Sequence, residues 1–127
     1  MSVEPSKLPA VLVVEDEPLI RMDAVDMIEH AGFKTYAAGS ADKAIVLMNS
    51  HDDIGVLFTD IDMPGTMDGL ELAEVVRGRW PGVMILIASG AYGMEEASLP
   101  DGSWFLPKPY SSVHVMQKLE GITARLG

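Results

Sequence analysis

The chain has 127 residues and a mass of 13.7 kDa, which is the size of one domain. Hydrophobic residues make up 48% of it, enough for a buried core, so global disorder is excluded. Acidic residues outnumber basic ones by 19 to 9, and the net charge of −10 argues against nucleic-acid binding, while the absence of cysteine excludes disulfides and thiolate metal sites.

The first part of the chain predicts a tail, a strand and a helix. Residues 1–8 lack an apolar stretch, so we expect a disordered tail without a secretory signal, followed by one domain over residues 9–127. Ala10–Val14 is a short apolar run rich in β-branched residues, which is typical of a buried parallel strand. A helix follows, with Pro18 in its first turn and Gly32 at its end. Its predicted inward face consists of Ile20, Ala24, Met27, Ile28 and Ala31.

The alternation of strands and helices continues to the end of the chain. We predict further strands at 33–38, 54–58, 83–88 and 103–106, and further helices that begin at Ser40, at Asp68 or Gly69, near Ala91 and at Ser111. The longest apolar run, Val83–Ala88, is too short to span a bilayer, so we expect a cytoplasmic protein without a membrane partner. The predicted fold is α/β and flavodoxin-like: a five-stranded parallel sheet in the order 2-1-3-4-5 with helices on both faces, a three-layer sandwich.

Polar residues follow the predicted strands at the edge where such sheets bind ligands. Glu15 and Asp16 come directly after the first strand, Asp60 after the third, Ser89 after the fourth and Lys108 after the last. If the first and third strands are adjacent, the three carboxylates crowd together and repel one another unless a cation intervenes. Oxygen ligands without imidazole or thiol favour Mg²⁺, and an opposing lysine and hydroxyl suit phosphoryl oxygens. Asp60 is then a candidate nucleophile, because carboxylates form aspartyl-phosphates.

These residues, in this order and spacing, resemble the receiver domain of two-component response regulators over almost the whole chain, from about Pro9 to Leu126. The matching stretches are Val11–Glu17, Leu57–Pro64, Met67–Leu72, Ile85–Gly90 and Phe105–Pro109. The resemblance implies that Asp60 accepts a phosphoryl group from a histidine kinase or a histidine phosphotransfer protein. It also implies that Glu15, Asp16 and Asp60 hold Mg²⁺ together with the backbone carbonyl of Asp62.

The remaining implied roles concern the phosphoryl oxygens and the switch. Ser89 and Lys108 would each bind a phosphoryl oxygen, Phe105 would be the aromatic switch residue, and the Lys108–Pro109 bond would be cis. The sequence departs from the usual pattern by serine in place of threonine at position 89 and by phenylalanine in place of tyrosine at position 105. The loop after Pro64 is also one residue longer than the commonest pattern. Further pieces are similar to stand-alone, chemotaxis-type single-domain receivers of α-proteobacteria, namely Ile87–Gly93, Leu99–Pro100 and Leu106–Tyr110.

The last part of the chain indicates how the domain would pass on a signal. Only one predicted helix follows Lys108, so we expect no output domain and a downstream protein partner instead. That partner would bind the face formed by the fourth helix near Ala91, the strand 103–106 and the last helix. The stretch from Ser89 to Lys108 leaves little room for that fourth helix. We expect the helix to be loosely held and to become ordered on activation.

Two other functions fit parts of the pattern. Asp60-Ile61-Asp62 matches the DxD signature of haloacid-dehalogenase-type phosphatases, which also use an aspartyl-phosphate and Mg²⁺. That fold places its DxD after the first strand, however, whereas Asp60 follows the third. The second alternative is a pseudo-receiver that binds partners without phosphorylation, which occurs where an acid or the lysine is missing, and none is missing here.

Overall fold

Five parallel strands form one sheet in the order β2-β1-β3-β4-β5 in a computed structural model that describes residues 8–61, 67–90 and 102–124. This confirms the predicted strand order. The strands are β1 (Ala10–Val14), β2 (Thr35–Ala38), β3 (Ile54–Asp60), β4 (Met84–Ser89) and β5 (Ser103–Pro107). The helices are α1 (Pro18–His30), α2 (Ala41–Ser50), α3 (Gly69–Arg79) and α4 (Ser112–Thr123). Residues 1–7 of the expected tail and the expected short helix near Ala91 lie outside the described residues, whereas Leu8, the last residue of that tail, is half-buried against the core.

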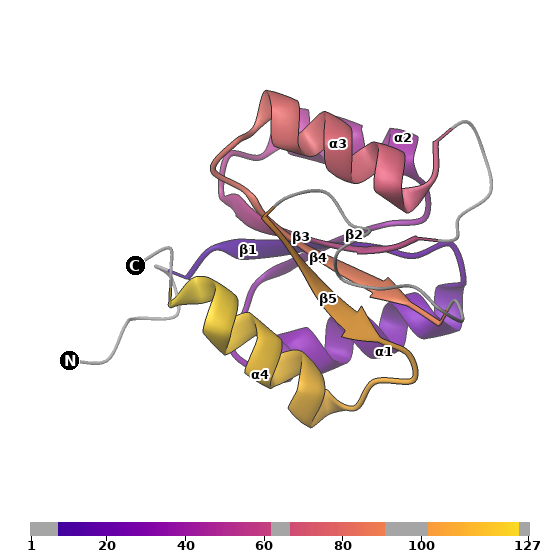
Figure 1. Cartoon of the computed structure of the whole chain (residues 1–127), viewed down its shortest axis with the longest axis vertical. Helices are drawn as coiled ribbons and strands as arrows, with labels where there is room; N and C mark the ends of the chain where they lie inside the picture. Colours follow the sequence, from indigo (N-terminus) through magenta and orange to yellow (C-terminus); the bar gives the residue numbers. More distant parts are fainter. Residues whose placement is uncertain (1–7, 62–66, 91–101, 125–127) are drawn as a thin grey trace.

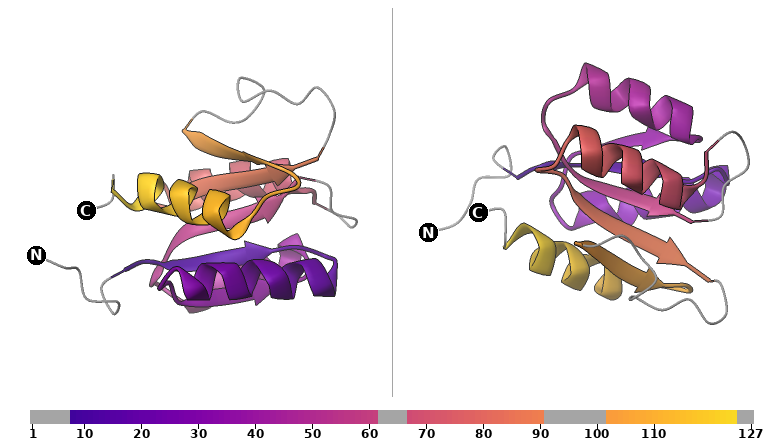
Figure 2. Two further views of the ribbon diagram at one scale, coloured as in Figure 1. Left: turned by 90° about the horizontal axis from the view of Figure 1, so that it is seen from below. Right: turned by 45° about the horizontal axis from the view of Figure 1, so that its top comes forward.

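Two layers of helices cover the sheet, with α1 and α4 on one face and α2 and α3 on the other (Figures 1 and 2). Successive residues of a strand point to opposite faces, so Val11 and Val13 of β1 join the core under α1 and α4, while Leu12 and Val14 join the core under α2 and α3. All five β1 residues are therefore buried, which explains the continuous apolar run. Within the described residues, no helix is long and apolar enough to cross a membrane.

Local hydrogen bonds set the ends of the helices. Ser40, the N-cap of α2, accepts a hydrogen bond from the backbone N–H of Lys43, as its position in the sequence predicts. Asp68 and Glu71 form a reciprocal capping box at the start of α3. After α1, Gly32 has a φ of 97°, in the left-handed region that favours glycine at the end of a helix. These residues set where α2 and α3 begin and where α1 ends relative to the neighbouring strands.

Several boundaries and faces differ from the prediction. β3 continues through Thr59 and Asp60 because both are buried and paired with β4. The helical spacing of Leu70, Ala73 and Val76 predicts that Leu70 of α3 points inward, but Leu70 is only partly buried, whereas Leu72 is fully buried. Ile20 of α1, predicted to face the core, is 42% exposed, and Met116 of α4, whose spacing from Leu119 predicts the same, is 40% exposed. Ile20 lies in the first turn of α1 and lines an open cavity, which accounts for its exposure.

Gly69 packs directly on the backbone at the end of β3. A Cβ at this position would collide with the carbonyl oxygen of Asp60 and lie 2.7 Å from its carbonyl carbon. We expect Gly69→Ala to lower the free energy of unfolding by about 2 kcal/mol, because backbone atoms cannot yield as a side chain can. Gly78→Ala, in the same helix with open space around it, should instead raise it by about 0.5–1 kcal/mol. Urea unfolding of both variants measures this, and equal effects would contradict the contact.

Candidate functional site

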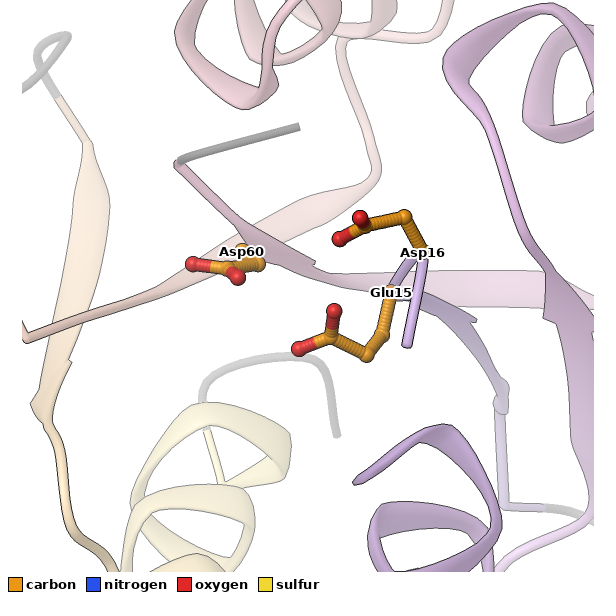
Figure 3. Close-up of side chains that lie close together, drawn as sticks. All are labelled: Glu15, Asp16 and Asp60. Carbon is orange, nitrogen blue, oxygen red and sulfur yellow. The ribbon is translucent and has the colours of Figure 1, made fainter. Parts of the chain in front are cut away.

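Three carboxylates lie close together at the carboxyl ends of β1 and β3 (Figure 3). Glu15 and Asp16 directly follow β1, and Asp60 is the last residue of β3. Because these two parallel strands are neighbours, their ends bring the side chains together, and one oxygen of each lies within 4.8 Å of the others. Glu15 is 5% exposed and Asp60 is 8% exposed, while Asp16 is half-buried. Carboxylates at this spacing repel one another unless a cation lies between them.

Lys108 brings a positive charge to this site from the loop after β5. Its Nζ donates a hydrogen bond to Oδ2 of Asp60 at 2.9 Å and lies 3.5 Å from Oε1 of Glu15. Burial lowers the pKa of Lys108, but the hydrogen bond and the charge of Asp60, together with the charge of Glu15, raise it above its ordinary value. The ammonium therefore stays protonated beside the two acids.

Burial also acts on Glu15. It raises the pKa of this carboxyl, while the hydrogen bond that Oε2 accepts from the backbone N–H of Glu17, at 3.1 Å, lowers it. Asp16 and Asp60 raise the pKa of Glu15 further and Lys108 lowers it, so that its value ends above the ordinary one. One ammonium thus compensates only part of the negative charge that the three acids place at this edge of the sheet.

Ser89 lies at the same edge, as the last residue of β4, and is 2% exposed. Its backbone oxygen accepts a hydrogen bond from the N–H of Lys108 at 2.9 Å, and Ser89 pairs with Pro107 in the sheet. The backbone therefore holds Ser89 and Lys108 side by side next to Asp60, whose strand pairs with β4. The Lys108–Pro109 peptide bond is cis, the isomer that the resemblance implies.

The other two predicted site residues stand apart from this cluster. Phe105 lies on β5 opposite Ile87 and packs against the core under α2 and α3, half-buried. Asp62, whose backbone carbonyl was expected to bind the metal, lies outside the described residues. The structure thus brings together Glu15, Asp16, Asp60 and Lys108, places Ser89 on the adjoining strand end, and leaves Phe105 further back along β5.

Sequence reasoning did not identify Tyr110. Its ring lies 5.7 Å from that of Phe58, and it lines an open cavity of about 510 Å³ beside the acidic cluster. Burial raises the pKa of Tyr110, and the charge of Lys108 opposes this shift. The other lining residues are Ile20, Asp23, Met27, Gly90, Lys108 and Pro109. Tyr110 could have been identified from its position directly after Lys108-Pro109, because this loop follows the last strand at the edge where the site residues lie.

Comparison with known proteins matches this arrangement to one family. Residues 11–120 match the response regulator receiver domain. The chain is 31% identical over 115 residues to the C4-dicarboxylate transport transcriptional regulatory protein DctD of Rhizobium meliloti, covering 88% of this chain and 25% of that protein. It is 30% identical over 118 residues to the transcriptional regulatory protein PdtaR of Mycobacterium tuberculosis, covering 91% of this chain and 57% of that protein. The chain thus spans only part of the length of these relatives.

Solved structures agree with the sequence comparison. A response regulator receiver protein from Sinorhizobium medicae is 29% identical, with a TM-score of 0.81 over 92% of this chain and 95% of that one. A receiver domain protein from Clostridium thermocellum, 20% identical, shares the fold with a TM-score of 0.85 over 93% of this chain and 96% of that one. The chain belongs to the response regulator receiver domain family and has the fold of two-component signalling receivers.

Comparison of two lysine–aspartate pairs, one buried and one exposed, measures how much Lys108 contributes to the free energy of unfolding. We expect Lys108→Met to lower the free energy of unfolding by about 2 kcal/mol in metal-free buffer, because it leaves two buried carboxylates without their counter-charge. Lys34 pairs with Asp53 at a similar distance, 3.2 Å, but the two side chains are 64% and 42% exposed. Lys34→Met should therefore lower the free energy of unfolding much less than Lys108→Met does. Equal losses in urea unfolding would show that burial of the Lys108 pair has no energetic consequence.

Proposed function

We propose that this receiver domain accepts a phosphoryl group on Asp60 from a histidine kinase or a histidine phosphotransfer protein, and thereby switches a protein-binding face. The observation that carries the proposal is the convergence of Glu15, Asp16, Asp60 and Lys108 at one edge of the sheet. A carboxylate can attack phosphorus only if the charge of both partners is compensated. Lys108 can compensate negative charge directly, and the three acids can do so by binding a cation.

Mg²⁺ is the cation that these donors suit. The cluster offers only carboxylate oxygens, and it belongs to a family whose members generally use Mg²⁺ at an acidic pocket. Glu15, Asp16 and Asp60 would hold the ion together with the backbone carbonyl of Asp62. When bound, the ion neutralises the carboxylates and a phosphoryl oxygen.

The chain's own residues would then perform the transfer. An oxygen of Asp60 attacks the phosphorus of the donor's phosphohistidine, an O–P bond forms, and the N–P bond breaks with its electron pair left on the imidazole. Lys108, already 2.9 Å from Oδ2 of Asp60, would shift its hydrogen bond to a phosphoryl oxygen. The hydroxyl of Ser89 would bind a second oxygen, and Phe105 would turn into the space that Ser89 leaves.

The domain would act as a signalling switch in the cytoplasm, with at most self-phosphorylation and autodephosphorylation as catalysis. We propose that its output is contact with another protein at the face that includes β5 and α4. In support, Val113 is 52% exposed and Met116 is 40% exposed on α4. The fourth helix near Ala91, expected at this face, lies outside the described residues. The phosphatase alternative is not favoured, because Asp60 ends the third strand of the chain.

Phosphorylation of Asp60 can be tested directly. After incubation with acetyl phosphate and Mg²⁺, the intact mass should rise by one phosphoryl group, and Asp60→Asn should abolish the rise because it removes the nucleophile. Asp53→Asn, which changes an exposed aspartate at the other end of β3, is the matched control and should keep it. A phosphatase would turn acetyl phosphate over without durable modification, and a pseudo-receiver would stay unmodified. Modification that persists in the Asp60→Asn variant would rule out Asp60 as the acceptor.

Metal binding should appear as stabilisation. We expect the Tm to rise with millimolar Mg²⁺, because an ion that binds only the folded state stabilises it by mass action. Asp16→Asn should raise the Tm in metal-free buffer by relieving repulsion and should weaken the response to Mg²⁺. Asp52→Asn, an exposed aspartate before β3, should change neither. A wild-type Tm that is indifferent to Mg²⁺ would contradict a shared site.

A further inference from the structure

Arg21, in the first turns of α1, reaches back to the loop that carries two of the three acids. Its guanidinium Nη1 donates a hydrogen bond to the backbone carbonyl oxygen of Glu15 at 2.8 Å. That carbonyl belongs to the peptide group that joins Glu15 to Asp16. Holding this peptide group restrains the backbone torsions on either side of it, ψ of Glu15 and φ of Asp16, and so limits the directions in which the two side chains can approach Asp60.

Gly39 gives the guanidinium its space. A Cβ at Gly39 would lie 2.9 Å from Nη1 of Arg21 and 3.7 Å from its Cζ, and among the described residues beyond its two chain neighbours it would meet no other atom within 4 Å. Gly39 has no left-handed conformation, since the described glycines with positive φ are Gly32 and Gly102. Its backbone could therefore hold an alanine, and what the side chain would disturb is the position of Arg21.

Arg21 binds a backbone oxygen beside the acids and forms no ion pair with a described carboxylate. In the described part of the chain, the ion pairs within 4.0 Å are those of Lys34 with Asp53 and of Lys108 with Glu15 and Asp60, so Arg21 is in none of them. The guanidinium binds a main-chain oxygen beside the acids, not a carboxylate oxygen. Lys108, in contrast, occupies one oxygen each of Glu15 and Asp60.

We infer that Arg21 and Gly39 form a positioning pair for the Mg²⁺ site: Gly39 leaves room for the guanidinium, and the guanidinium holds the Glu15–Asp16 peptide group in the orientation that lets the carboxylates share one cation. This inference rests on the proposed function. Neither residue is a metal ligand in it. Groups that orient metal ligands commonly govern affinity by an order of magnitude or more.

The experiment measures the initial rate of phosphorylation by acetyl phosphate as a function of Mg²⁺ concentration. Arg21→Ala and Gly39→Ala should each raise the Mg²⁺ concentration for half-saturation by about tenfold, with the rate at saturating Mg²⁺ within about twofold of wild type. Arg21→Lys, which keeps the charge and a donor, should stay within about threefold. In the Arg21→Ala background, Gly39→Ala should add nothing, because the only atoms its Cβ would meet are gone.

Two control variants separate this effect from general ones. Gly78→Ala adds the same methyl group where nothing lies within 4 Å, and Arg79→Ala removes the same charge from the exposed end of α3. Both should keep the wild-type half-saturation. Binding of Mg²⁺ alone, by calorimetry, gives a second readout that does not depend on phosphorylation, and Arg21→Lys and Gly39→Ala carry the test if Arg21→Ala does not fold.

The inference is overturned if Arg21→Ala and Gly39→Ala lose stability in metal-free buffer but keep the wild-type half-saturation, since both residues would then serve the fold alone. It is also overturned if the two effects add in the double variant. In either case, a wild-type chain that binds Mg²⁺ and is phosphorylated on Asp60 leaves the proposed function intact. A wild-type chain that neither binds Mg²⁺ nor is phosphorylated refutes the proposed function itself.

Discussion

Repulsion among three carboxylates at one edge of the sheet is the constraint on which the site depends. Glu15 and Asp60 are nearly buried, and burial raises the energetic cost of holding two negative charges close together. Lys108 offsets part of this cost through contacts with both. A site with more acids than bases is poised to gain stability from any cation that enters it. Function and stability oppose each other here, because filling the site with apolar side chains would remove the affinity for a cation.

The two cores hold these charges in place. The central strands β1, β3 and β4 are buried on both faces, by α1 and α4 on one side and by α2 and α3 on the other. Each strand delivers its functional side chain at the residue where the apolar run ends, so the ladder of hydrogen bonds sets the spacing between Glu15, Asp60 and Ser89. Burial of the strands therefore holds the site in place, and its side chains come from the last residues of β3 and β4 and from the residues that follow β1 and β5.

The sequence allowed the fold and most of the site to be predicted because parallel strands with two buried faces leave continuous apolar runs. Ala10–Val14 was predicted with its exact bounds, and the position of the acids after β1 and β3 followed from the topology. Helix faces were less predictable. Leu70 and Leu72 are both apolar, and only packing against the sheet decides which of them is buried. Arg21 on α1 and Gly39, between β2 and α2, are close in space but far apart in the sequence, and no local pattern encodes their proximity.

Under the proposed function, backbone hydrogen bonds would connect the phosphorylation site to the partner face. The N–H of Lys108 donates to the oxygen of Ser89, and Ser89 pairs with Pro107 on β5. If Ser89 moves toward a phosphoryl group, this pairing transmits the movement to the end of β5 and to the loop before α4. Phe105 lies two residues before Pro107 on β5, the edge strand of the described sheet, and it is half-buried against the core under α2 and α3. Under the proposed function, β5 is therefore the strand through which a change at Asp60 would reach the partner face.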